Sequence, residues 1–112
     1  MKDEIVKLSE TYMNMVSGDH HKDRDCHWYI NTVYSYGNEP VFRIEHNGYI
    51  FDPEPQAYKE FDTYEQAEKG LLDLIQRAVD DQVEWATNVL KDPLKWDKYQ
   101  VKHAEQIIRL TP

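Results

Sequence analysis

Apolar residues recur at helical spacing in three parts of the chain, and each part predicts an amphipathic helix. The first covers residues 3–17 and ends at Ser17-Gly18, because glycine commonly follows the last turn of a helix. The second covers residues 63–91, where both Asp62 with Glu65 and Thr63 with Gln66 have the spacing of a capping box, and Asp92-Pro93 ends it. The third runs from Leu94 to Leu110.

Between the first two helices, β-branched and aromatic residues predict three strands. Cys26–Tyr36 is the first strand and Val41–His46 is the second. Asn47-Gly48 is the dipeptide that two-residue hairpin turns favour, which makes Tyr49–Asp52 the third strand and sets Arg43 opposite Asp52. From Pro53 to Glu60 we expect an irregular connection.

The expected fold is therefore α+β, with a three-stranded antiparallel β-meander, an N-terminal helix, a long helix and a C-terminal helix in the order α-β-β-β-α-α. At 112 residues the chain has the size of one domain over residues 1–112. The long helix measures about 40 Å at the usual rise per residue, which exceeds what three short strands can cover. Its far end needs another partner, and the final helix can supply one by folding back.

Composition indicates a folded protein of the cell interior. Hydrophobic residues make up 40% of the chain, and charges interrupt every apolar run, so we expect no membrane partner and no secretory signal. Cys26 is the only cysteine, which excludes an intramolecular disulfide and fits a reducing, cytoplasmic location.

The net charge of −8 opposes binding to nucleic acid, because an acidic surface repels phosphate backbones. The charge is uneven. Ten acidic and three basic residues lie between Asp52 and Glu84, whereas five basic and three acidic residues lie between Lys91 and Arg109. One hypothesis is that the acidic region imitates nucleic acid and occupies a nucleic-acid-binding protein.

The element order across residues 3–91 is similar to that of the double-stranded RNA-binding domain. That family binds RNA through lysines at the start of its second helix. The corresponding stretch here, residues 63–69, carries Glu65 and Glu68, so the resemblance implies the order of elements and not RNA binding.

The polar segment before the first strand contains the residue types that bind zinc and other transition metals. Its candidate ligands are His20, His21, Asp23, Cys26 and His27. Their spacing matches no established metal signature, so the pattern is more typical of an exposed polar loop, and we expect no metal or other cofactor. A metal- or small-ligand-binding enzyme that uses this segment remains an alternative.

Motifs of the common enzyme classes are absent from the sequence. It contains no GxSxG, P-loop, GxGxxG or HExxH pattern, and the adjacent side chains of Cys26 and His27 should point to opposite faces of a strand. These observations favour a noncatalytic role.

The pattern instead favours a protein-interaction or regulatory module. Apolar residues at the far end of the long helix, Trp85, Val89 and Leu90, are candidates for a homodimer contact. Lys91, Lys95, Lys98 and Lys102 follow at i, i+4, i+7 and i+11, which predicts a basic stripe on one face of the last helix for an acidic partner.

Overall fold

The computed structural model describes residues 2–17, 27–34, 37, 39–47 and 60–111. The elements follow the predicted order. They are α1 (Lys2–Ser17), β1 (His27–Val33), β2 (Val41–Asn47), β3 (Glu60–Phe61), α2 (Tyr64–Lys91), a 3₁₀ turn η2 (Pro93–Lys95) and α3 (Lys98–Leu110). The strands form one antiparallel sheet in the order β1-β2-β3, so the α+β meander with its three helices is confirmed.

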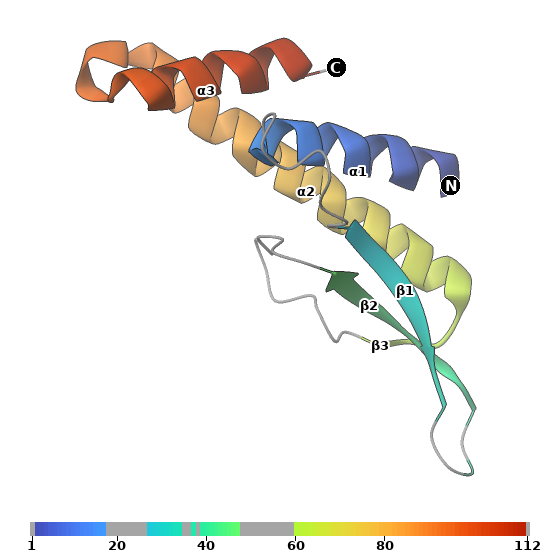
Figure 1. Cartoon of the computed structure of the whole chain (residues 1–112). Coiled ribbons are helices and arrows are strands. Elements are labelled where there is room, and N and C mark those ends of the chain that lie inside the picture. Colours follow the sequence, from blue (N-terminus) through green and yellow to red (C-terminus); the bar gives the residue numbers. More distant parts are fainter. Residues whose placement is uncertain (1, 18–26, 35–36, 38, 48–59, 112) are drawn as a thin grey trace.

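The long helix α2 contacts each of the other helices and strands that the structure describes. Figure 1 shows the strands beside its N-terminal half, α3 folded back along its C-terminal half, and α1 lying against it. The predicted need for a second partner at the far end of α2 is met by α3, since Ala86 and Val89 are buried together with Ala104 and Ile107.

The sheet turns one face toward the helices. The register pairs Ile30 with Ile44, and Ile44 is buried while Ile30 packs against the same core. Trp28, two residues earlier on β1, is only 5% exposed and lies against the ring of Tyr12 on α1, with the ring centroids 5.0 Å apart. Period-two alternation of the strand thus carries the core from the sheet onto both α1 and α2. The buried core residues are Tyr12, Met15, Trp28, Ile44, Leu71, Leu74, Ile75, Ala78, Val79, Ala86, Val89, Ala104 and Ile107.

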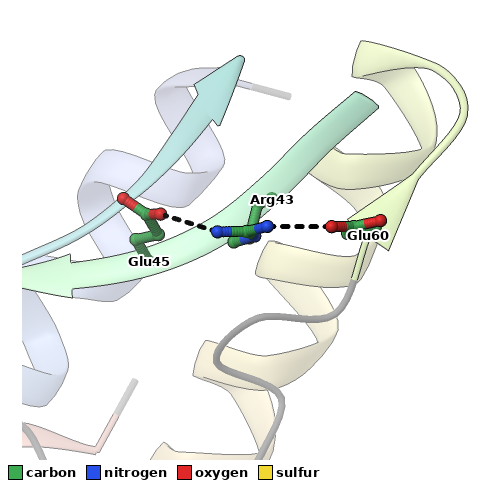
Figure 2. A network of polar contacts seen from close by, with 3 residues as sticks. All are labelled: Arg43, Glu45 and Glu60. Atoms are coloured by element: carbon green, nitrogen blue, oxygen red, sulfur yellow. Dashed lines mark hydrogen bonds and ion pairs between the residues drawn. The ribbon is translucent and has the colours of Figure 1, made fainter. Parts of the chain in front are cut away.

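The third strand differs from its prediction. β3 is Glu60–Phe61, which begins at the last residue of the segment expected to be irregular, and the predicted third strand, residues 49–52, lies outside the described part of the chain. On the β3 side of β2, the residue opposite Arg43 is Glu60. Arg43 Nη2 donates to Glu60 Oε1 at 2.8 Å, and Arg43 Nη1 lies 3.8 Å from Glu45 Oε1, as Figure 2 shows. An ion pair between Arg43 and Glu60 thus joins β2 to β3.

The start of α2 agrees with its capping pattern. Thr63 is the N-cap, and its hydroxyl accepts a hydrogen bond from the backbone N–H of Gln66 at 3.1 Å. This bond satisfies one of the amide groups that a first helical turn leaves unpaired. Within the described residues no helix is long and apolar enough to cross a membrane.

Phe61 of β3 lies so close to α2 that the helix needs a glycine beneath it. A Cβ atom built on Gly70 would sit 2.5 Å from Cζ of Phe61, well inside van der Waals contact. Glycine weakens a helix interior by about 1 kcal/mol relative to alanine. The absence of a side chain at Gly70 leaves room for the ring of Phe61 to pack on α2, and this packing offsets the cost.

We predict that Gly70→Ala lowers the free energy of unfolding by about 1 kcal/mol, because a cost of roughly 1–3 kcal/mol for overpacking exceeds the gain in helix propensity. In a Phe61→Ala background the overlap is gone, so the same substitution should stabilise the protein by about 1 kcal/mol. Urea unfolding of the four proteins in this cycle measures both effects. An effect of the same sign in both backgrounds would contradict the contact.

Candidate functional site

The predicted metal segment lies almost wholly outside the described residues. His20, His21, Asp23 and Cys26 belong to residues 18–26, and His27 is described only as the first backbone position of β1. In the part of the chain that is described, no three histidine, cysteine, aspartate or glutamate side chains come together as a metal site. The metal hypothesis stays a prediction.

The apolar end of α2 is packed and does not project freely. Val89 is fully buried, so its side chain offers no surface to a partner. Leu90 is half-buried against the core, and Trp85 makes an edge-to-face contact with Trp96 at a centroid distance of 6.2 Å. These residues join α2 to the chain segment that follows it.

His103 of α3 ties this end of the molecule to α1. Its Nε2 atom lies 2.7 Å from the backbone oxygen of Met15, and its ring is 5.7 Å from that of Trp85. Because a carbonyl oxygen only accepts, the protonated Nε2 is the donor in this contact. The α2–α3 hairpin is therefore anchored to α1 by a polar contact as well as by apolar packing.

The four lysines are all exposed, but they do not share one face of the last helix. Lys91 ends α2, Lys95 ends η2, and only Lys98 and Lys102 belong to α3. The predicted single stripe is wrong because the helix predicted to begin at Leu94 begins four residues later. The lysines come from three successive elements at the turn between α2 and α3.

Two exposed apolar side chains belong to the same stretch of chain as these lysines. Leu94 is 97% exposed and Tyr99 is 80% exposed. We name this surface the hairpin tip and define it as Lys91, Leu94, Lys95, Lys98, Tyr99 and Lys102. Figure 1 shows the turn that carries it at one end of the molecule, far from the strands.

The sequence pattern missed the exposure of Leu94 for a physical reason. In an unbroken helix Leu94 lies seven residues before Val101, so both would fall on the same buried face. The 3₁₀ turn over Pro93–Lys95 and the extended backbone at Trp96 interrupt that phase. Pro93 after Asp92 was the available signal, because proline interrupts a helix. The helical spacing of residues before and after such a break need not be continuous.

Local hydrogen bonds fix the shape of the hairpin tip. One carboxylate oxygen of Asp97 accepts from the backbone N–H groups of Tyr99 and Gln100, both at 2.9 Å. The side-chain oxygen of Gln100 accepts in return from the backbone N–H of Asp97 at 3.3 Å, which completes a capping box. The exposed side chains are thus presented on a defined turn.

A shallow hollow of about 480 Å³ opens beside Phe61 on the opposite half of α2. Gly70 and Leu74 contribute to its lining, with Lys69, Asp73 and Arg77 as its charged residues. Its lining contains no serine, cysteine or histidine, the residues that most often act as nucleophiles or bases. Among the described residues, the charged lining of this hollow is therefore of mixed sign.

Comparison with known proteins identifies no relative, since no family model, curated protein or solved structure matches the chain.

We predict that Asp97→Ala lowers the free energy of unfolding by about 1 kcal/mol, the usual cost of losing an N-cap carboxylate. Asp92→Ala is the matched control, because the side chain of Asp92 makes no capping hydrogen bond at the same turn. It should change stability by less than about 0.5 kcal/mol. Thermal or urea unfolding separates the two variants, and equal losses would contradict the capping box.

Proposed function

We propose that this protein is a noncatalytic interaction module that binds an acidic counterpart through the hairpin tip. The observation that carries the proposal is Leu94, which is 97% exposed on a hydrogen-bonded turn whose flanking elements carry four exposed lysines. We prefer this surface to the expected homodimer contact through Trp85, Val89 and Leu90, because Val89 is buried.

The apolar part of the hairpin tip supports binding because its transfer out of water is favourable. Complete burial of a leucine or tyrosine side chain contributes about 1.5–3 kcal/mol, and the capped turn already holds the backbone in place. Little conformational freedom of the backbone is then lost when a counterpart binds.

The charged part of the hairpin tip supports an acidic counterpart. Four lysines outnumber the two aspartates of the same turn, Asp92 and Asp97, and the carboxylate of Asp97 is engaged by two backbone N–H groups. The whole chain carries −8, so the hairpin tip is a local exception to the sign of the surface. Such a patch steers association with negatively charged surfaces.

The test is a photoreactive amino acid inserted at position 94 of the full chain, with position 10 of α1 as the control because Glu10 is also exposed. Irradiation in cells should give a cross-linked product from position 94 that is absent from position 10. Mass spectrometry of the product distinguishes a second copy, another protein and a lipid.

In a Lys95→Glu, Lys98→Glu background the specific product should fall by at least tenfold, since each reversed lysine changes an attraction into a repulsion. Identical products from positions 94 and 10, or a product that is indifferent to the charge reversal, would show that the hairpin tip is not the docking surface.

A further inference from the structure

The shape of the hairpin tip restricts what can bind it. The molecule measures 59 Å along its longest axis and 26 and 22 Å across, and the tip lies at one end, as Figure 1 shows. Leu94 and Tyr99 are exposed by 97% and 80%, so they protrude and do not line a groove. A rigid protein partner would need a preformed pocket of matching shape, whereas a deformable surface needs none.

The positions of the lysines further restrict the kind of partner that can bind the hairpin tip. Lys91, Lys95 and Lys98 belong to α2, η2 and α3, so they lie before and after Leu94 on three successive elements of the turn. A flat negative surface approached end-on can meet all of them at once. A partner that lay along one side of a helix would reach only some.

We propose that the hairpin tip docks end-on at a membrane surface rich in anionic lipid headgroups, an inference that rests on the proposed function of this tip. Leucine side chains enter the boundary between headgroups and acyl chains, and tyrosine favours the same depth because its ring is apolar and its hydroxyl is polar. Lysine stems lie along the apolar boundary while their ammonium groups reach the phosphates. This mode departs from the sequence-based expectation of no membrane partner, which rested on the lack of a long apolar run, because docking of a turn requires no span.

The distribution of charge along the molecule favours one orientation. Seven acidic and two basic residues lie between Asp62 and Glu84, all on or just before α2 and nearer to the sheet than the hairpin tip is. An anionic surface repels this region and attracts the lysines. At physiological ionic strength such forces fade within about 8 Å, so a molecule that stands on its tip keeps most of its negative charge beyond the range of repulsion.

The experiment is flotation of the full chain with vesicles of phosphatidylcholine alone and of equal parts phosphatidylcholine and phosphatidylglycerol. We expect binding to the anionic vesicles only, and weaker binding as salt is raised. Leu94→Ala should weaken the binding about tenfold through the loss of inserted apolar surface. This variant should fold normally because the side chain is 97% exposed.

Charge reversal provides the matched comparison. Lys95→Glu with Lys98→Glu should weaken binding at least tenfold. Lys2→Glu with Lys7→Glu makes the same change in net charge at exposed positions of α1 and should leave binding within about twofold. Equal effects of the two pairs would mean that net charge alone governs binding and would overturn the inference.

Failure of the lipid inference is distinguishable from failure of the proposed function. If anionic vesicles leave the protein unbound while position 94 cross-links specifically to a second copy or another protein, the lipid inference is overturned and the interaction module stands. If neither assay gives a product that depends on Leu94 and the lysines, both are overturned.

Discussion

Burial of the apolar stripe of α2 is the interaction on which the rest of the structure depends. This single helix of 28 residues is longer than the sheet, so its stripe needs two successive coverings. The sheet contacts the first half, α3 contacts the second half, and α1 touches both α2 and α3. A helix that met only the sheet would expose Ala86 and Val89 to water, which is why the chain reverses at Asp92-Pro93 and returns along α2.

The elements whose signals are local could be predicted from the sequence. Thr63 marks the start of α2 because its hydroxyl lies within reach of an amide three residues away, and the capping spacing is visible in the sequence. The third strand could not be predicted in this way. Its position depends on the ring of Phe61 over Gly70 and on the ion pair between Arg43 and Glu60, which are separated by nine and seventeen residues along the chain. Contacts of that range leave no periodic pattern in the sequence.

The same distinction between local signals and long-range contacts applies to the candidate site. Exposure of the lysines followed from their spacing and their charge, whereas their distribution over three elements depended on where α3 begins. That start is set by the carboxylate of Asp97, which offers a second N-cap only a few residues after α2 ends. The burial of Val89 could not be predicted from its own segment, since it requires a helix that comes later in the chain.

The hairpin tip and the core are stabilised by different interactions, and this separation gives the proposed surface its freedom to bind. The turn is held by short-range hydrogen bonds to Asp97, and its side chains Leu94 and Tyr99 contribute almost no buried area to the fold. Replacement of Leu94 or Tyr99 therefore removes neither core packing nor a capping hydrogen bond. Their exposure is therefore not a by-product of core packing, and the turn between α2 and α3 combines exposed apolar groups with positive charge.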